Sequence, residues 1–359
     1  MNFTKINQIQ NAFLIYVNIK SFDQRNKLEN SFDEFKSLVL SSGLTIQDQR
    51  NISQNNPVIN TFLSKGKIED FKQSILQDEF DIVVINHELS ASQTRNLEKY
   101  LNKRVIDKTE LILDIFASRA SSHVGKLQVE LAQLKHLSTR LIRGWTHLER
   151  QKGGIGLRGP GETQLETDRR LIGNRIKQLK KRLDKQHNQK NLNRYSRKKG
   201  NNKLVALVGY SNAGKTSLFN RLTKGGLEAE DKLFATLDTT TRRANFKFKA
   251  LDTVLFSDTV GFISNLPTKL IESFKATLDD LASADLLIHV IDAADPDKDY
   301  KIEQVNLILE DLGVSEVPQI RALNKIDLLQ GTQIMPANNQ YPETKISSET
   351  KEGLDELKI

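Results

Sequence analysis

The sequence contains no cysteine among its 359 residues. This absence excludes a disulfide scaffold, a thiol nucleophile and metal centres held by cysteine. Only six histidines are present and they are scattered, so we do not expect a metal site built from protein ligands alone. Mean hydropathy is −0.47, and no stretch approaches the roughly 18 apolar residues that cross a bilayer. We expect a cytoplasmic protein without a membrane span, with peripheral membrane association as the remaining option.

Positive charge is concentrated in one part of the chain. The net charge is +8, yet residues 180–203 alone hold ten lysines and arginines against one acid, Asp184. The rest of the chain is therefore close to neutral. Such a window is either a solvated linker or an electrostatic contact with nucleic-acid phosphates, and the sequence leaves both open.

The first part of the chain, residues 1–115, has the pattern of a small α/β subdomain. Residues 13–17 and 82–85 are short, β-branched and apolar, as buried parallel strands are. Residues 31–40 and 68–76 have helical spacing between them. Helices packed on a parallel sheet account for this alternation.

Residues 116–185 predict a long antiparallel helical hairpin. Two narrow apolar stripes, each with steps of three, four or seven residues, indicate two paired helices. The segment between them, residues 152–163, is too rich in glycine to be helical. This tip is either a flexible loop or a probe that enters a partner, and its candidate contacts are Gly153, Gly154, Gly156, Arg158, Gly159 and Gly161.

A basic linker, residues 186–202, is expected to precede a doubly wound α/β domain at residues 203–359. Residues 204–208 form a strand, which leads into a phosphate-binding loop and then a helix at residues 216–222. This loop matches G-x-x-x-x-G-K-[ST], whose backbone amides bind a nucleoside triphosphate. Its residues, with the one that follows, are Gly209, Tyr210, Ser211, Asn212, Ala213, Gly214, Lys215, Thr216 and Ser217.

Two further motifs follow later strands of the same domain. Asp258, Thr259, Val260 and Gly261 fit D-x-x-G, in which the aspartate faces Mg²⁺ and the glycine amide senses the γ-phosphate. Lys215 is expected to contact the β- and γ-phosphates, and the Thr216 hydroxyl to bind Mg²⁺. The base site is predicted from Asn324, Lys325 and Asp327, with backbone contacts from Ser347 and Ser348.

The order of these motifs favours GTP over ATP. The Asp327 carboxylate accepts hydrogen bonds from guanine N1–H and the exocyclic amine, whereas adenine presents a lone pair at N1. A switch segment lies between the first two motifs and offers several threonines, among which spacing does not choose. Phe262 follows Gly261, where many GTPases have the glutamine that orients water. We therefore expect intrinsic hydrolysis to be slow, or to depend on another group, a cation or a partner.

These residues resemble the HflX family of translational GTPases, which is close to the Obg and TrmE GTPases. The likeness extends over nearly the whole chain and is most specific outside the nucleotide motifs. It is carried by residues 87–98, 105–117, 128–132 and 153–166, by the switch residues 234–238, and by residues 284–293.

The resemblance implies a GTPase that binds the large ribosomal subunit and its rRNA and splits stalled ribosomes. In this picture the glycine-rich tip reaches toward the peptidyl-transferase region. Family position selects Thr236 as the Mg²⁺-binding and catalytic threonine, next to Phe234 and Ala235 in the nucleotide site. Asn212 matches an asparagine that binds a monovalent cation in some relatives, which makes K⁺ stimulation a hypothesis.

Two departures from the family pattern accompany the resemblance. Thr239 stands where the family usually has proline, and the chain stops about ten residues after Ser348, so the C-terminal extension of many relatives is missing. We expect a monomeric enzyme that hydrolyses GTP to GDP and phosphate with Lys215, Thr236 and Gly261 as catalytic residues. The alternative is an RNA-binding ribosome assembly or remodelling factor with nucleotide-regulated binding and little hydrolysis.

Overall fold

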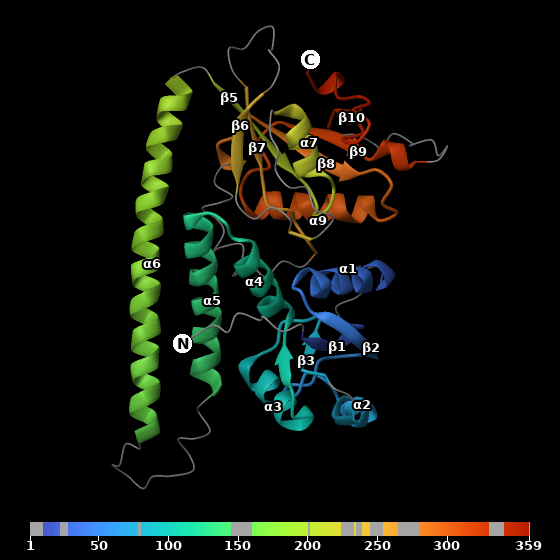
Figure 1. Cartoon of the computed structure of the whole chain (residues 1–359), viewed down its shortest axis with the longest axis vertical. Helices are drawn as coiled ribbons and strands as arrows, with labels where there is room; N and C mark the ends of the chain where they lie inside the picture. The colour runs from blue at the N-terminus through green and yellow to red at the C-terminus, as the bar shows by residue number, and fades with distance from the viewer. Residues whose placement is uncertain are drawn as a thin grey trace. The chain divides into compact units, whose positions relative to one another are not determined.

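The structure is a computed structural model of the whole chain (Figure 1). It describes residues 10–21, 28–77, 80–144, 160–199, 202–223, 233–234, 239–244, 254–264, 281–329 and 341–358. The chain divides into two compact units, one made of residues 1–118 and 130–180 and the other of residues 119–129 and 181–359. Among the described helices, none is long and apolar enough to cross a membrane.

The first unit contains a four-stranded parallel sheet with the strand order β2-β1-β3-β4. The predicted strands at residues 13–17 and 82–85 and the helices at 31–40 and 68–76 are confirmed. The elements are β1 (Asn11–Ile19), α1 (Leu28–Ser41), β2 (Thr45–Gln54), α2 (Lys65–Gln77), β3 (Ile82–Ile85), α3 (Ala91–Leu101), β4 (Arg104–Ile106) and α4 (Lys108–Arg119).

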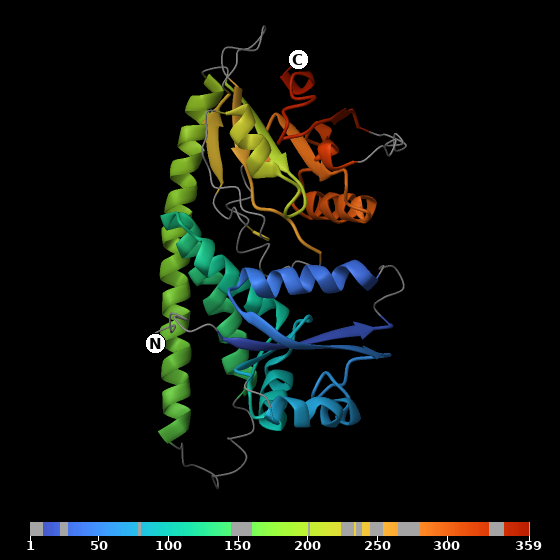
Figure 2. The same cartoon turned by 45° about the vertical axis from the view of Figure 1, so that its right-hand side comes forward.

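Alternation along β1 places helices on both faces of this sheet (Figure 2). Phe13 and the residues two and four positions later belong to a buried cluster that includes side chains of α2 and α3. Tyr16 points to the opposite face, where its ring lies 5.1 Å from Phe32 and 6.2 Å from Phe35 of α1. Because successive side chains of a strand point to opposite faces, a strand buried on both must be apolar throughout. This explains why β1 was recognisable from sequence.

Two long helices, α5 (His123–Gly144) and α6 (Pro160–Lys199), follow the first sheet. Each contributes residues to both units. Within the first unit, Arg175 of α6 lies 2.7 Å from Glu130 of α5, and Leu179 is fully buried. The Arg175–Glu130 ion pair therefore joins α6 to α5.

Helix α6 differs from its prediction at both ends. We expected a hairpin that ends at residue 185 and a glycine-rich segment that reaches residue 163, but α6 begins at Pro160 and continues to Lys199. Proline is tolerated in the first turn of a helix because its missing N–H has no intrahelical partner there, so Gly161 is helical rather than part of the tip. Most of the basic window, through Lys199, therefore lies on a helix.

The second unit is built on a six-stranded sheet with the order β10-β9-β8-β5-β7-β6, in which β6 alone runs antiparallel to its neighbour. The strand predicted at residues 204–208 is confirmed and begins one residue earlier. The elements are β5 (Lys203–Val208), α7 (Lys215–Leu222), β6 (Thr240–Arg243), β7 (Val254–Asp258), β8 (Leu286–Asp292), α9 (Lys298–Asp311), β9 (Gln319–Asn324), η1 (Ile326–Leu328), β10 (Glu343–Lys345) and η2 (Glu356–Lys358).

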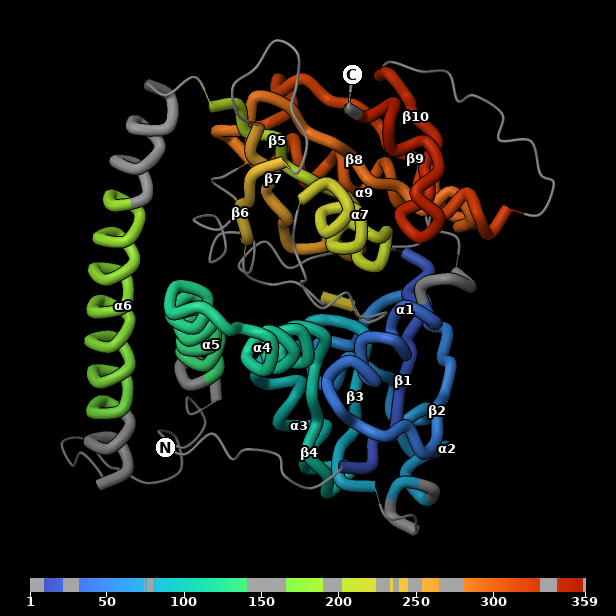
Figure 3. Tube along the Cα trace, turned by 45° about the horizontal axis from the view of Figure 1, so that its top comes forward, coloured from blue at the N-terminus to red at the C-terminus, as the bar shows by residue number. Residues whose placement is uncertain are grey.

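The core of the second unit brings the carboxyl ends of several strands to one edge. Buried side chains of β5, β7, β8 and β9 pack together with Leu218, Phe219 and Leu222 of α7. Figure 3 shows β5 running into α7, with β7 and β8 on either side of β5 in the sheet. The loops after parallel strands therefore converge where α/β domains bind their ligands.

Candidate nucleotide-binding site

The phosphate-binding loop runs from β5 to α7, and its geometry requires glycine at both ends. Gly209 has φ +149°, and a Cβ there would lie 2.2 Å from the carbonyl oxygen of Val290. Gly214 has φ +89°, and a Cβ there would lie 2.2 Å from Nδ2 of Asn324. Side chains at these two positions would collide with a strand and with the base-site asparagine, so only glycine fits.

Lys215 lies beneath this loop and is buried. Its Nζ donates to the carbonyl oxygen of Tyr210 at 2.7 Å. Burial lowers the pKa of Lys215 to about 8, against the opposing effect of the Asp258 carboxylate. A buried ammonium group is costly to keep charged, and it gains a strong electrostatic partner when phosphate oxygens bind beside it.

Two oxygen donors lie together at the start of α7. The Thr216 hydroxyl donates to Asp258 Oδ2 at 2.8 Å, and Asp258 at the end of β7 is fully buried. The neighbouring Thr259 hydroxyl donates to the Leu207 carbonyl at 2.6 Å, which fastens this segment to β5. A hydroxyl and a carboxylate at this separation are the hard oxygen ligands that Mg²⁺ prefers, so this pair could hold that ion.

The D-x-x-G segment packs directly against the phosphate-binding loop. The Ser211 amide donates to the Phe262 carbonyl at 2.6 Å, and the Phe262 amide donates to the Gly209 carbonyl at 3.2 Å. A Cβ on Gly261 would lie 2.7 Å from Ser211 Cα. Phe262 itself is buried, so its side chain cannot orient a water molecule.

Two phosphate-loop side chains hold the switch segments. The Tyr210 hydroxyl accepts a hydrogen bond from the Ser264 amide at 2.6 Å, two residues after Phe262. The Ser211 hydroxyl accepts one from the Phe234 amide at 2.9 Å, and Phe234 is buried with φ +57°. Phe234 at the start of the switch segment and Ser264 after the D-x-x-G motif are thus both anchored to the phosphate-binding loop.

The base end of the site is organised by Asn324. Its Nδ2 donates to the Ala213 carbonyl at 2.9 Å, and its Oδ1 accepts from both the amide and the hydroxyl of Ser348 at 2.9 Å. One buried side chain therefore joins the phosphate-binding loop to the loop after β10. The Ser347 hydroxyl donates to Asp327 Oδ1 at 2.5 Å, which places Asp327 in the same group.

Three residues near this site were missed by sequence reasoning. Arg221 of α7 donates to the carbonyls of Ser348 and Glu349 at 2.8 and 3.2 Å. Asp292 forms an ion pair with Lys325 at 2.7 Å. His289, buried on β8, accepts a hydrogen bond from Gln319 at 3.0 Å. These contacts join segments distant in sequence, so no local pattern indicates them.

The environment of His289 fixes its charge state. Burial, together with the positive charges of Arg321 and Lys215, lowers the pKa of His289 to about 3. The ring is therefore neutral and contributes a polar contact inside the sheet without adding charge behind the phosphate-binding loop.

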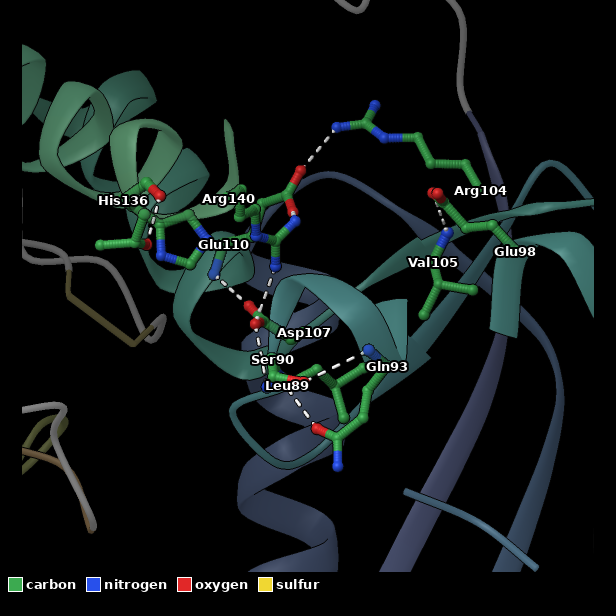
Figure 4. Close-up of polar contacts among 11 residues, drawn as sticks. Leu89, Ser90, Gln93, Glu98, Arg104, Val105, Asp107, Glu110, His136 and Arg140 are labelled. Carbon is green, nitrogen blue, oxygen red and sulfur yellow. Dashed lines mark hydrogen bonds and ion pairs between the residues drawn. The ribbon is translucent and has the colours of Figure 1, made fainter. Parts of the chain in front are cut away.

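The first unit contains a separate cluster of ionisable groups (Figure 4). Asp107, Glu110 and His136 each offer one ligand atom, and these atoms lie within 4.8 Å of one another. Arg140, however, donates to Asp107 at 2.8 Å and to Glu110 at 2.6 Å, so its guanidinium already neutralises these carboxylates. Arg104 adds a further contact to Glu110 at 2.9 Å. This cluster is best explained as an ion-pair network that joins α4 to α5.

Burial in this cluster changes the pKa values of two groups. Burial and the Glu110 charge raise the pKa of Asp114 to about 6, with Arg104 acting in the opposite direction. Burial lowers the pKa of His136, while the Asp107 charge opposes that shift. Asp107 and Glu110 are three residues apart at the start of α4, and His136 and Arg140 are four residues apart in α5, so each pair lies on one side of its helix.

Several predicted site residues lie outside the described residues. Within the switch these are Ala235 and the predicted Mg²⁺-binding Thr236. In the glycine-rich tip they are Gly153, Gly154, Gly156, Arg158 and Gly159.

Family models match most of the chain. Residues 29–117 match the family described as GTP-binding GTPase N-terminal, and residues 119–197 the GTP-binding GTPase middle region. Residues 204–325 match the family described as 50S ribosome-binding GTPase. The crystal structure of SsGBP with GDP has a TM-score of 0.53 at 24% identity, covering 98% of this chain and 96% of that one, which shows a similar fold.

Sequence relatives specify the family. GTPase HflX of Escherichia coli is 48% identical over 353 residues, which cover 97% of this chain and 81% of the relative. GTPase HflX of Magnetococcus marinus is 45% identical over 335 residues, covering 93% of this chain and 77% of that protein. At this level of identity, and with the phosphate-binding loop, D-x-x-G segment and base site assembled in one domain, the chain belongs to the HflX family of GTPases.

Proposed function

We propose that this GTPase acts on the large ribosomal subunit and promotes the dissociation of ribosomes under stress. The observation that carries this proposal is the match of residues 204–325 to GTPases described as binding the 50S ribosome. Exposed lysines and an exposed arginine in the described part of α6, Lys180, Lys181 and Arg182, support an rRNA partner, because phosphate contacts dominate such binding. The protein acts in the cytoplasm as a monomer.

Guanine enters the base site between the loops after β9 and β10. The Asp327 carboxylate accepts hydrogen bonds from guanine N1–H and the exocyclic amine, which adenine cannot supply. The backbone at Ser347 and Ser348 faces O6, and the Asn324 contacts set its position relative to the phosphate-binding loop. The stem of Lys325 packs on the face of the base.

The triphosphate lies over the loop from Gly209 to Thr216, with the amide of Ser217 at the start of α7. Lys215 contacts the β- and γ-phosphates. Thr216 and Asp258, whose side-chain oxygens lie 2.8 Å apart, would hold Mg²⁺ together with Thr236, and the ion would neutralise phosphate charge. The Gly261 amide senses the γ-phosphate, and Thr259 and Val260 form the turn that positions this amide.

Hydrolysis in this protein depends on a partner. Phe262 is buried and its backbone is paired with the phosphate-binding loop, so it supplies no group that activates water. We infer that Asn212, which is exposed and has φ +65°, would hold a K⁺ ion that adds positive charge near the β- and γ-phosphates. The buried Phe262 also supports the second candidate function, an RNA-binding assembly or remodelling factor that barely hydrolyses GTP.

The ribosome contact is the glycine-rich tip. We assign α5 and α6 to an antiparallel hairpin, supported by the Glu130–Arg175 ion pair, with residues 153–159 at its end. Glycines there allow close approach to rRNA, and Arg158 supplies charge for its phosphates. The N-terminal subdomain at 1–115 supports this hairpin, and the basic residues at 186–202 lead to the GTPase domain at 203–359.

GTP hydrolysis measured with purified 50S subunits tests this proposal. We expect the subunits to raise the rate, and replacement of residues 153–159 by a serine–glycine linker of equal length to abolish the increase without changing GDP affinity. The control variant Asp327→Asn should lose the response to GTP but respond to the subunits with XTP. Subunits that bind without raising hydrolysis would support the assembly-factor alternative instead.

A further inference from the structure

Asp292 ends β8 directly beside the base site. In the parallel pairing of β8 with β9, Asp292 lies opposite Asn324, and Lys325 is the next residue along the chain. The Ala293 amide also donates to the Asn324 carbonyl at 2.8 Å, so the two strand ends are held in register. This register brings a carboxylate and an ammonium group together from positions 33 residues apart in the sequence.

The Asp292 carboxylate holds the Lys325 ammonium in one place. Lys325 Nζ lies 2.7 Å from Asp292 Oδ2, and about three quarters of each side chain is buried. The other carboxylate oxygen, Oδ1, accepts a hydrogen bond from the Ala294 amide at 3.0 Å, which fixes its orientation. Lys325 itself has φ +64°, a strained conformation that persists only when its surroundings hold it.

We propose that Asp292 is a positioning residue for guanine-nucleotide binding, because it presets the aliphatic stem of Lys325 against the face of the base. This inference rests on the proposed role of Asn324, Lys325 and Asp327 as the base site. A free lysine side chain loses much rotamer entropy when it is ordered by a ligand. The ion pair orders the Lys325 stem before the nucleotide arrives, and such preorganisation raises affinity.

The role assigned to Asp292 predicts a distinct pattern of effects. The base contact is the same in both nucleotide states, so Asp292→Asn should weaken GDP and GMPPNP equally, by about fivefold to tenfold, the scale of the cost of ordering one long side chain on binding. KM for GTP should rise by the same factor while kcat at saturating GTP stays unchanged, because the effect is uniform binding. A residue that acted on the switch segments would instead change the affinities for GDP and GMPPNP by different factors.

Isothermal titration calorimetry on the full chain tests this pattern. GDP and GMPPNP are titrated into the wild-type protein, Asp292→Asn, Lys325→Met and the double variant. Lys325→Met keeps an apolar stem but removes the ammonium, so Asp292→Asn should cause no further loss in that background. The control is Asp285→Asn, which removes a similar pair with Lys203 at the opposite end of β8 and should leave both affinities within about twofold of wild type.

The outcomes separate this inference from the proposed base site. Unchanged affinity in Asp292→Asn, or losses that add in the double variant, would overturn the inference. Asp327→Asn, titrated with GDP and XDP, reports on the base site itself: without a shift toward XDP, the proposed base site fails as well. Should Asp292→Asn not fold, judged by circular dichroism, Lys325→Met alone must show the equal loss for GDP and GMPPNP.

Discussion

Removal of the Asn324 side chain should uncouple the phosphate-binding loop from the loop after β10. Asn324 is 1% exposed and makes three side-chain hydrogen bonds of 2.9 Å, one to Ala213 and two to Ser348. In Asn324→Ala, each lost bond costs about 1 kcal/mol net, because the groups left behind are buried and lack a partner. The local opening free energy should therefore fall by about 3 kcal/mol.

Hydrogen exchange measured without nucleotide provides the assay. A loss of about 3 kcal/mol corresponds to roughly a hundredfold faster exchange of amides in these loops. We expect this acceleration in peptides covering residues 211–215 and 346–350 together. Asn306→Ala on α9 is the control and should leave both peptides unchanged. Acceleration confined to residues 346–350, with a protected phosphate-binding loop, would refute the argument that one side chain couples the two.

Three further predictions concern charge. Burial lowers the pKa of Lys215 to about 8, and its side chain must be protonated to pair with phosphate. GDP affinity measured by calorimetry should therefore fall up to tenfold per pH unit above 8; a flat profile to pH 9.5 would contradict this. The pKa of His289 is lowered to about 3 in the folded protein. As the pH falls below 6.5, the unfolded state therefore binds a proton on this ring that the folded state does not bind. Protection of β8 amides should therefore drop by about 2 kcal/mol between pH 7 and 5, and His289→Gln should remove most of this drop. Hydrolysis should be faster in K⁺ than in Na⁺, and Asn212→Ala should abolish the difference; equal wild-type rates would argue against a K⁺ site.

The parts of the fold that sequence predicted best are those where burial dictates composition. The strand β5 is apolar on both faces and is followed directly by the phosphate-binding loop, so its pattern is unambiguous. The edge strand β2, with the sequence TIQDQRNISQ, was missed because it is polar and largely exposed. Its backbone hydrogen bonds to β1 define it as a strand, although its composition is not typical of one.

The contacts of the candidate site also fall into those that the sequence predicts and those that it does not. Motif spacing placed Lys215, Asp258 and Asn324 in one site because each lies at or after the carboxyl end of a strand of one sheet, and their contacts agree with that arrangement. The pairs Asp292–Lys325 and Asp107–Arg140 depend on strand register and helix packing between distant segments. Such contacts become visible only once the fold is known.

Co-sedimentation with purified ribosomes and subunits tests the central claim most directly. The protein is mixed with 70S, 50S and 30S particles in the presence of GMPPNP, GDP or no nucleotide, at two salt concentrations. We predict GMPPNP-dependent binding to the 50S subunit that persists at the higher salt, and loss of intact 70S particles when GTP is supplied. Binding that ignores the nucleotide and disappears at higher salt would contradict the account, because it would show phosphate attraction without a specific site.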